Sequence, residues 1–405
     1  MFIRNSLAAY GAPLDSEDRM ALGVLGSREV ARFLAHRDGH RPTPLLSLSA
    51  AARELGVGSI RIKDEAHRLG LGSFKALGGA YAVIRLAIEA ASERLGRAVD
   101  IAEWRSPAVA DTSAHMTVAC ATDGNHGRSV AQGAQLVGAR CVIFVHAGVS
   151  AQRAAAIARF GATLVRVEGT YGDSVAEAAR QADANGWTLV SDTSWPGYER
   201  IPRLVMQGYT AMLQEAADAM PEPPTHVFVQ SGVGGVAAAA AAFLAEVYGV
   251  QRPVFTVVDP SLAACLFESA RAGHPVKVAP GEPTVMAMLA CYEPSLIAWR
   301  ILSRLADAFM TVEDTDATGA MRRLAHPTGP DPVIVAGESG GVGLAALIKI
   351  AANRRAREAL RLGPDARVFL INTEGATDPL LYEQLVGSSP DVISSNAQQR
   401  HPVNA

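Results

Sequence analysis

The stretch that decides the fold runs from Met116 to Gly169 and reads MTVACATDGNHGRSVAQGAQLVGARCVIFVHAGVSAQRAAAIARFGATLVRVEG. It contains three short β-branched runs, separated by alanine-rich helical segments and glycine turns. Strands that alternate with helices in this way are typical of a parallel sheet covered by helices. The stretch therefore predicts an α/β unit.

A second series of the same kind occupies the later part of the chain. It begins with THVFVQ at Thr225–Gln230, passes through an alanine-rich helix to VFTVVD at Val254–Asp259, and ends with RVFLINTEG near residue 370. We expect two α/β domains, each an open, mostly parallel, twisted sheet flanked by helices. The expected ranges are residues 1–80 plus 206–386 for a large domain, 81–205 for a small domain, and 387–405 for a polar, frayed tail.

The composition argues against several classes of protein. Of the 405 residues, 49% are hydrophobic and 19% are charged, which suffices for a large core in two domains. The 37 basic and 40 acidic residues form no long run of one sign, so nothing favours nucleic acid or an anionic membrane as a partner. The longest apolar stretch, Val236–Ala245, is too short to cross a bilayer, and the first residues lack the apolar core of a signal peptide. We expect a cytoplasmic protein with a small-molecule partner.

Cysteines and histidines form no recognisable metal or disulfide framework. None of the four cysteines is part of a CxxC pair, and the sequence leaves open whether Cys265 and Cys291 pair. His36 and His40 have the spacing of a helical metal pair, but the glycine before His40 and the prolines after it favour a polar turn. We expect no catalytic metal.

Lys75 stands at an unusual position in GSFKALGG, residues 72–79. Ser59–Asp64 has the pattern of a short strand and Ala76–Ile88 that of an apolar helix, so Lys75 falls at a strand-to-helix junction. Lysine is usually a surface residue, and the partial positive charge at a helix N-terminus disfavours an ammonium group. This placement favours a lysine that acts as a neutral amine.

A glycine-rich turn follows a predicted strand and opens a helix in QSGVGGVAAAA, Gln230–Ala240. Glycines let the backbone approach an anion, and the free amides and helix dipole favour a phosphate there. Gly232, Gly234 and Ala237 also match the spacing of a dinucleotide-binding fold. Asp259 then stands where a ribose-binding acid is expected. Tight turns alone attract glycine too, which is the purely structural alternative.

A second strand-to-helix turn, TDGNHGRSVA at Thr122–Ala131, is more polar than a turn requires. Its amides can hold a carboxylate at the start of the helix, while the side chain of Asn125 contacts a cofactor oxygen. Turns often contain Asp, Asn and Gly for their backbone preferences alone, so a plain turn is the alternative. A further glycine turn, AGESGGVGLAAL at residues 336–347, is interpreted as packing beside the site.

A lysine at one strand end, a phosphate loop at another and a carboxylate loop at a third describe a site for an amino acid bound to a phosphorylated aldehyde. Pyridoxal 5'-phosphate fits this description, because a lysine forms its Schiff base and its ring acts as an electron sink. A nicotinamide-dependent dehydrogenase would leave Lys75 and Asn125 without an explanation. A non-catalytic binder of phosphorylated metabolites is the remaining alternative.

The three motifs together resemble those of the fold type II pyridoxal-phosphate enzymes, the group of threonine dehydratase and the tryptophan synthase β chain. GSFKALGG, TDGNHGRSVA and SGVGGV occur in the family's order, and the resemblance spans residues 40–380. It implies a cofactor in the cleft between two domains and a homodimer. The cofactor contacts that it implies are Lys75, Phe74, Asn125, Gly232, Val233, Gly234, Gly235 and Thr373.

Longer segments narrow the resemblance to the diaminopropionate ammonia-lyases. SDTSWPGYERIPRLVMQGY at residues 191–209 and EGTYGDS at residues 168–174 join the motifs above in this match. Asp123 stands where dehydratases of hydroxy amino acids have a small neutral residue. The implied activity is the α,β-elimination of D- and L-2,3-diaminopropionate to pyruvate and two molecules of ammonia. A dehydratase of serine, threonine or hydroxyaspartate is the nearest alternative.

The resemblance assigns two acids to this chemistry. Lys75 and Asp123 are expected to remove the α-proton from opposite faces of the substrate, and Asp192 to pair with the β-ammonium. Without the resemblance, Asp192 would be interpreted as a cap or turn acid. The expected substrate contacts are Ser73, Thr122, Asp123, Gly124, His126, Tyr171 and Asp192.

Overall fold

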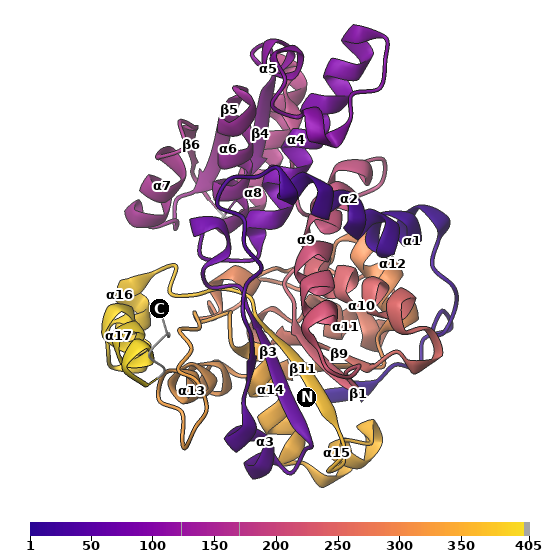
Figure 1. Cartoon of the computed structure of the whole chain (residues 1–405), viewed down its shortest axis with the longest axis vertical. Helices are drawn as coiled ribbons and strands as arrows, with labels where there is room; N and C mark the ends of the chain where they lie inside the picture. The colour runs from indigo at the N-terminus through magenta and orange to yellow at the C-terminus, as the bar shows by residue number, and fades with distance from the viewer. Residues whose placement is uncertain (123, 170, 401–405) are drawn as a thin grey trace. The chain divides into compact units, whose positions relative to one another are not determined.

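The computed structural model describes residues 1–122, 124–169 and 171–400 (Figure 1). The chain divides into two compact units. The first unit consists of Met1–Val24, Pro42–His67 and the chain from Met212 onward, and the second consists of Leu25–Arg41 and Arg68–Ala211. Each unit contains a mostly or wholly parallel sheet with helices packed on it, so the predicted α/β class is confirmed.

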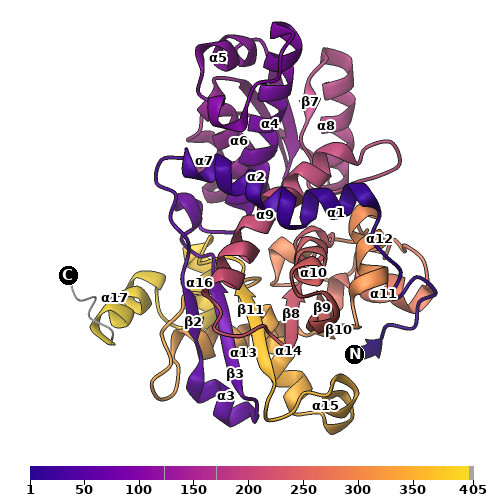
Figure 2. The ribbon, with the colours of Figure 1, turned by 45° about the vertical axis from the view of Figure 1, so that its right-hand side comes forward.

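The first unit is built on a seven-stranded sheet in the order β1-β10-β9-β8-β11-β3-β2 (Figure 2). These strands are β1 (Phe2–Arg4), β2 (Leu45–Ser47), β3 (Ser59–Asp64), β8 (His226–Gln230), β9 (Val254–Pro260), β10 (Ala308–Val312) and β11 (Arg367–Asn372). The inner strands pair in parallel, and the two edge strands β1 and β2 pair antiparallel. Every residue of β8 and β10 is buried, as expected for parallel strands covered on both faces.

The helices of the first unit lie between these strands or follow the last of them. They are α1 (Ser16–Leu22), α3 (Ser49–Leu55), α10 (Gly235–Tyr248), α11 (Cys265–Ala272), α12 (Leu296–Leu305), α13 (Asp314–Ala325), α14 (Val342–Ala351), α15 (Arg354–Leu360), α16 (Pro379–Val386) and α17 (Pro390–Arg400). The long helix α9 (Arg200–Ala219) begins in the second unit and ends in the first. Short 3₁₀ turns at Gly249–Gln251, Ser261–Ala263 and Ala287–Leu289 complete the connections.

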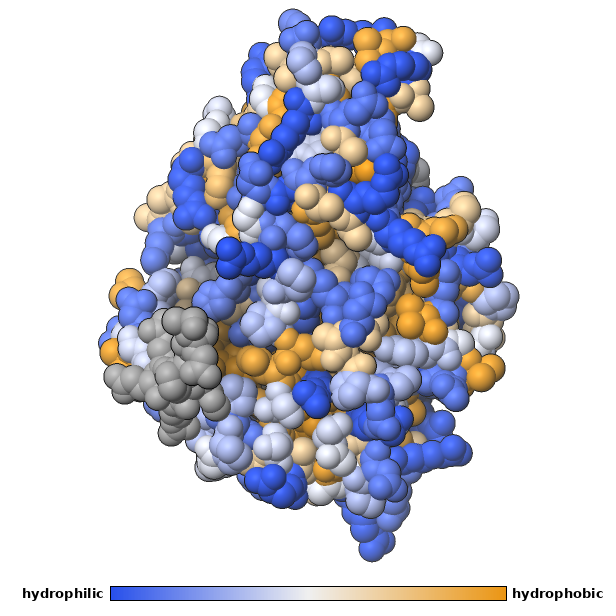
Figure 3. Space-filling model, in the orientation of Figure 1, coloured by the Kyte–Doolittle hydropathy of each residue, from blue (hydrophilic) through white to orange (hydrophobic). Residues whose placement is uncertain are grey.

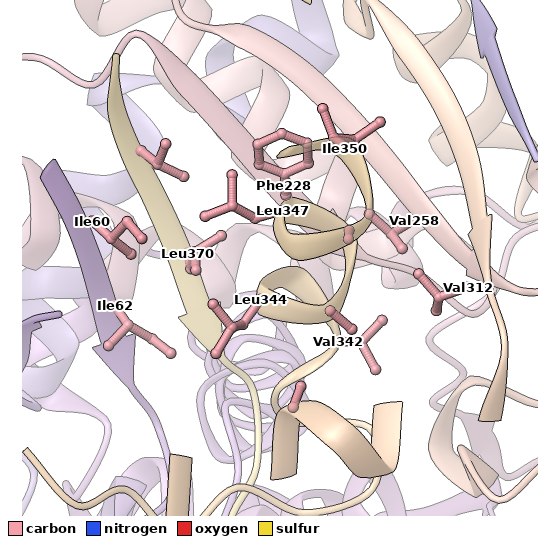
Figure 4. Packing of buried hydrophobic residues seen from close by; sticks show 14 of the residues in the cluster. Ile60, Ile62, Phe228, Val258, Val312, Val342, Leu344, Leu347, Ile350 and Leu370 are labelled. Atoms are coloured by element: carbon pink, nitrogen blue, oxygen red, sulfur yellow. The ribbon is translucent and has the colours of Figure 1, made fainter. Parts of the chain in front are cut away.

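One hydrophobic core of the first unit lies between its sheet and α14, with contributions from α3, α13 and α15 (Figure 4). Leu344 and Leu347 of α14 face side chains of the sheet strands, including Ile62 and Phe228. Alternate residues of a strand point to the same face, which is why β3 presents both of its isoleucines to this helix. Each such side chain contributes about 1.5–3 kcal/mol when it is fully buried. This packing holds in place the strand ends that carry the loops discussed below.

The second unit contains a wholly parallel four-stranded sheet in the order β6-β5-β4-β7. Its strands are β4 (Thr117–Ala121), β5 (Arg140–His146), β6 (Thr163–Val167) and β7 (Thr188–Leu189). Its helices are α2 (Val24–Ala35), α4 (Lys75–Leu95), α5 (Pro107–Ser113), α6 (Asn125–Val137), α7 (Ala151–Ala158) and α8 (Tyr171–Asn185), with 3₁₀ turns η1 (Arg68–Gly70) and η2 (Ile101–Glu103). The stretch 116–169 thus forms three neighbouring strands of this sheet, as its alternating pattern predicted.

Glycines allow α4 and α6 to pack closely. A Cβ atom at Gly133 would lie 2.7 Å from Ala80 Cα, and one at Gly79 would lie 2.9 Å from Ser129 Oγ. Ser129 Oγ accepts a hydrogen bond from the Ala80 amide at 2.9 Å. The helix that begins at Lys75 is therefore fixed against the helix that begins at Asn125.

The compact units differ from the expected domain ranges in residues 25–41, 68–80 and 206–211, all of which belong to the second unit. The cause is tertiary packing. Phe33 of α2 lies 5.7 Å from the ring of Tyr81 on α4, which ties α2 to the second unit. The first turns of α4 pack closely on α6 of the second unit, where the Ala80 amide donates a hydrogen bond to Ser129 Oγ.

The expectation of a frayed tail from residue 387 is wrong for residues 390–400. They form helix α17, in which Ile393 is fully buried. Ile393 belongs to a small apolar cluster with Met321, Tyr382 and Val386. Burial of Ile393 in this cluster stabilises the helix, which the polar composition of the segment does not predict.

Polar residues dominate much of the face shown in Figure 3, with apolar residues gathered in smaller groups among them. The large apolar side chains that are exposed in the described part of the chain are Met1, Tyr10, Met20, Leu25, Leu95, Leu136, Val250, Leu262, Leu380 and Val392. No helix of the described residues has the length and apolar character needed to cross a membrane.

Candidate active site

Lys75 and Asp192 form an ion pair in the second unit, with Lys75 Nζ donating a hydrogen bond to Asp192 Oδ2. Lys75 is the first residue of α4, and Asp192 lies in the loop between β7 and α9. The two side chains are only 21% and 13% exposed. Burial would raise the pKa of Asp192, but the charges of Lys75 and His126 and the hydrogen bond from Lys75 outweigh it and hold the pKa well below its ordinary value.

A carboxylate beside an amine favours the ammonium form of that amine. The use of Lys75 as a neutral amine stays a prediction. The predicted start of a helix at Lys75 is confirmed.

Aromatic rings line the other side of the lysine. Lys75 Nζ lies 5.5 Å from the centroid of the Phe74 ring, within the range of a cation–π contact. The Phe74 ring in turn meets the ring of Tyr209 on α9 edge to face at 4.7 Å. A side chain at Gly78 would collide with Tyr209, so this glycine of the GSFKALGG motif serves the packing of α9 on α4. Burial raises the pKa of Tyr209, which keeps its hydroxyl neutral.

The turn after β4 and the start of α6 carry five of the predicted substrate or cofactor residues, at positions 122–126. Thr122 Oγ1 accepts hydrogen bonds from the amides of Gly124 and Gly127, each at 3.0 Å, so its oxygen serves the turn itself. Asn125 and His126 are buried at the first two positions of α6. Asp123 lies outside the described residues. The structure thus gives Thr122 a hydrogen-bonding role in the turn that the sequence analysis did not assign to it.

His126 is a neutral, buried imidazole next to the ion pair. Its Nε2 lies 3.0 Å from the Val190 carbonyl oxygen, which can only accept, so Nε2 carries the proton. Burial lowers the pKa of His126, the charge of Asp192 raises it and that of Lys75 lowers it, with a net lowering. Its Nδ1 is therefore an acceptor, and within the described part of the chain it has no hydrogen-bond partner.

Tyr198 anchors the loop that carries Asp192, a role that the sequence analysis missed. Its hydroxyl donates to the Leu189 carbonyl at 2.7 Å and accepts from the Ser191 amide at 3.0 Å. Its ring stacks on that of Trp195 at 4.2 Å. The only sequence signal was an aromatic residue close to an acid. Tyr171, the other predicted pocket residue, is half-buried at the first residue of α8.

The glycine turn at residues 232–235 lies in the first unit, between β8 and α10. Gly234 has a φ of 103°, a left-handed conformation that favours glycine. A Cβ atom at Gly232 would lie 2.9 Å from Cys291 Sγ, and the Val233 carbonyl accepts a hydrogen bond from the Ser295 amide at 2.9 Å. The turn is thus a rigid start to a 14-residue helix, which is the arrangement that binds a phosphate.

Thr373 follows β11 in the same unit and is held by Gln230. Gln230 Nε2 donates to Thr373 Oγ1 at 3.0 Å, and Thr373 Oγ1 donates to the Ser339 carbonyl at 3.3 Å. Two hydroxyls next to these groups, Ser231 Oγ and Ser339 Oγ, are buried and lack a hydrogen-bond partner among the residues that the structure describes. The sequence analysis missed both, because it treated the glycine turn around residue 340 as packing.

Asp259 does not have the position of a ribose-binding acid. It is buried, and its Oδ2 accepts hydrogen bonds from the amides of Leu266 and Phe267 at 2.9 Å each, at the start of α11. Burial raises its pKa to about 8, although the two amide hydrogen bonds oppose this. These two hydrogen bonds give Asp259 a structural role, so a bound dinucleotide is not needed to explain an acid at this position.

The four cysteines are free thiols. Cys265 Sγ lies 3.5 Å from the Gly232 carbonyl oxygen, so Cys265 and Cys291 both flank the glycine turn. No group of three or more metal-ligating side chains occurs within the described ranges.

The residues present fit pyridoxal phosphate. Each unit holds buried polar atoms without partners in the described chain, namely Ser73 Oγ and His126 Nδ1 in the second and Ser231 Oγ and Ser339 Oγ in the first. Such atoms are costly unless a ligand or water satisfies them. A primary amine at Lys75 and a helix-opening glycine turn at residues 232–235 are the two groups that a phosphorylated aldehyde requires.

Comparison with known families agrees with this assignment. Residues 36–374 match the family model described as "Pyridoxal-phosphate dependent enzyme". The chain therefore belongs to the pyridoxal-phosphate-dependent enzymes of fold type II, and the predicted cofactor is confirmed.

Within this family the chain belongs with the diaminopropionate ammonia-lyases. It is 40% identical over 389 residues to the enzyme of that name from Escherichia coli strain K12, covering 95% of each chain. It is 37% identical over 368 residues to the enzyme from Salmonella typhimurium strain LT2, covering 88% of this chain and 91% of the relative. The crystal structure of the Escherichia coli enzyme in complex with an aminoacrylate-PLP azomethine reaction intermediate superposes with a TM-score of 0.85 at 36% identity, covering 95% of this chain and 96% of the other.

Proposed function

We propose that this protein is a pyridoxal-phosphate-dependent carbon–nitrogen lyase that converts D- and L-2,3-diaminopropionate into pyruvate and two molecules of ammonia. The observation that carries this proposal is 40% identity to a diaminopropionate ammonia-lyase along 95% of the chain. The ion pair of Lys75 and Asp192 supports it independently, because a second carboxylate beside the reactive lysine suits a substrate with a second ammonium group.

The cofactor contacts that we propose are those expected from the sequence, with one addition. Lys75 supplies the amine, Asn125 faces the ring, residues 232–235 hold the phosphate through their amides, and Thr373 lies near the ring nitrogen. We add Ser339 because its backbone carbonyl contacts Thr373 Oγ1 and its own hydroxyl is buried without a partner among the described residues. When bound, the cofactor supplies an aldehyde for the substrate's α-amine and a ring that withdraws electrons from the α-carbon.

Asp192 is proposed to bind the β-ammonium of the substrate. Its lowered pKa keeps it ionised at neutral pH, so it offers a full negative charge to a cation. We propose that His126 Nδ1, an acceptor without a partner in the described residues, takes a second hydrogen bond from the same ammonium. Both contacts keep three hydrogens on the β-nitrogen, which can then leave as neutral ammonia with the electrons of the broken carbon–nitrogen bond.

The α-proton is proposed to go to Lys75 Nζ in one enantiomer and to the carboxylate of Asp123 in the other. For this step the lysine must be a free amine. Exchange with the substrate's α-amine would free Lys75 as a neutral amine, and Asp192, once paired with the substrate's ammonium, would no longer favour protonation of the lysine. Ser73 Oγ and the amides that open α6 are proposed to bind the α-carboxylate, with Gly124 and Thr122 shaping that turn and Tyr171 lining the pocket.

An activity panel tests the proposal. The purified protein with added pyridoxal phosphate is assayed for ammonia and pyruvate from D- and L-diaminopropionate and from D- and L-serine. We expect two ammonia per pyruvate from either diaminopropionate and a much lower kcat/KM with serine. A higher kcat/KM with serine would assign the protein to the hydroxy amino acid dehydratases instead.

Borohydride trapping tests the lysine. Reduction of the enzyme should fix the cofactor to the peptide that contains Lys75, as read by mass spectrometry, and Lys75→Ala should abolish turnover of both enantiomers. The matched control is Lys277→Ala, which removes an exposed lysine of the first unit. Attachment of the cofactor to a peptide that contains another lysine would contradict the proposal that Lys75 binds the cofactor.

We also propose that the enzyme is a cytoplasmic homodimer. Four free cysteines suit a reducing compartment, and a homodimer follows from the resemblance to the fold type II enzymes. Light scattering should give about twice the chain mass of 42.4 kDa, and cell fractionation should recover the activity with cytoplasmic markers.

A further inference from the structure

A cavity of about 340 Å³ lies in the second unit. Its walls come from the turn after α2, from η1, from the segment between η2 and α5, and from the later turns of α6. The volume is within the range of small-molecule sites. None of its wall residues has been given a role so far.

Arg37 is the most buried charged residue of this cavity, with 7% of its surface exposed. Its Nη2 donates to Gln132 Oε1, while its Nη1 is buried and has no hydrogen-bond partner in the described ranges. Burial, with the charge of Arg105 adding to it, lowers the pKa of Arg37 to about 10, which leaves the guanidinium charged at neutral pH. A buried cation with an unused donor is costly unless an acceptor reaches it.

Arg105 is the second guanidinium of the cavity and is more exposed than Arg37. It lies 4.5 Å above the buried ring of Trp104 and donates to Asp38 at 2.8 Å. Asp38 is 88% exposed, so its carboxylate is well hydrated and only partly offsets the two arginines. The cavity therefore has an excess of positive charge.

Aromatic packing holds both guanidinium groups in place. The ring of Phe33 lies 5.9 Å from the Arg37 guanidinium and 5.8 Å from the ring of Trp104. Arg37 and Arg105 are thus supported by two rings that are themselves in contact. A pair of planar donors with fixed orientations is the arrangement that recognises carboxylate and phosphate groups.

We propose that this cavity binds a small organic oxyanion, with its carboxylate or phosphate group between Arg37 and Arg105 and its carbon part against Leu69 and Leu136. The unused Nη1 of Arg37 supplies a hydrogen bond that no described residue takes, and the two leucines supply apolar wall. The site is distinct from the ion pair of Lys75 and Asp192, because none of its wall residues touches either side chain in the described contacts.

The site is connected through the backbone to both catalytic segments of the second unit. Leu69 lies in η1, which leads directly to Lys75, and Gln132 and Leu136 lie on the helix that begins at Asn125. A ligand in the cavity would contact both segments at once.

Calorimetric titration of the enzyme loaded with pyridoxal phosphate tests the proposal. The probes are inorganic phosphate and butyrate, each at constant ionic strength, and the probe that binds more tightly identifies the class of anion. Arg105→Gln removes one positive group, and Leu136→Glu places a negative charge in the wall. We expect either substitution to weaken binding of the tighter probe at least tenfold.

Two matched controls separate this site from general electrostatic attraction. Arg94→Gln and Leu95→Glu make the same chemical changes at exposed positions near the end of α4, outside the cavity walls. We expect both controls to bind within twofold of the unsubstituted enzyme. Absence of saturable binding with both probes would overturn the proposal, and so would equal affinities in all five proteins or equal losses in variants and controls.

Discussion

Asp192 pairs with Lys75 across a separation of 117 residues in the sequence. The contact joins the loop after β7 to the first residue of α4, within one compact unit. The lysine that we propose to bind the cofactor is therefore in contact with an acid. Asp192 thereby brings a carboxylate next to the amine of Lys75.

Asp192→Asn keeps the shape of this side chain and removes its charge. A hydrogen bond to a charged partner contributes about 1.5–3 kcal/mol, so we expect kcat/KM for both diaminopropionate enantiomers to fall about 10- to 100-fold. Steady-state ammonia assays measure this. Asp183→Asn, which changes an exposed acid on α8, is the control and should retain full activity. Unchanged kinetics in Asp192→Asn would show that the β-ammonium binds elsewhere.

Asp123→Asn tests the assignment of two bases to two faces. Loss of a general base typically lowers the rate about 10²- to 10⁴-fold. We expect a loss of that size in kcat for the D enantiomer, and a loss below about tenfold for the L enantiomer, whose proton goes to Lys75. Asp111→Asn, at an exposed position on α5, is the control. Equal losses for the two enantiomers would instead make Asp123 a binding or protonating group.

Tyr198→Phe removes the hydroxyl that ties the Asp192 loop to Leu189 and Ser191. The ring and its stacking on Trp195 remain, so the change acts on two hydrogen bonds only. Each contributes about 0.5–1.5 kcal/mol, and a loosened loop should raise KM several-fold while kcat changes less. Tyr248→Phe, in the first unit, serves as the control. A fall in kcat at constant KM would mean that Tyr198 acts on the chemistry itself.

The fold could be predicted where local pattern and tertiary structure agree. Residues 116–169 form β4, β5 and β6 because buried parallel strands need β-branched runs, and the helices between them need alanine-rich segments. The position of α2 could not be predicted, since it depends on Phe33 meeting Tyr81 and Trp104. The edge strands β1 and β2 are three residues each, too short for any periodicity.

The residues of the candidate site can likewise be separated into those with a local sequence signal and those without one. Lys75 and the turn at residues 232–235 were predictable because a lysine at a helix start and a run of glycines are unusual in themselves. Asp192 was indicated only by the resemblance, because an acid in a loop carries no local signal. Ser339 and Tyr198 were missed because their importance lies in distant partners, Thr373 for one and Leu189 for the other.

The raised pKa of Asp259 predicts how the free energy of unfolding depends on pH. Its pKa rises from 3.8 to about 8 on folding, mainly through burial. Between these values the folded protein holds a proton that the unfolded chain releases, so the free energy of unfolding must fall as pH rises. From pH 5 to pH 7.5 the fall is about 3 kcal/mol at most. Asp259→Asn can still accept from the Leu266 and Phe267 amides and has no proton to lose, so this fall should disappear.

Urea unfolding at pH 5 and pH 7.5 measures the effect as the difference between the two free energies of unfolding. Asp365→Asn, which changes an exposed acid of the same unit, should keep the pH dependence of the natural chain. If Asp259→Asn loses stability with pH as steeply as the natural chain, the buried carboxyl at the start of α11 is ionised in the folded protein. The same result would reopen the possibility that this acid is used to bind a ligand, which its two amide hydrogen bonds now argue against.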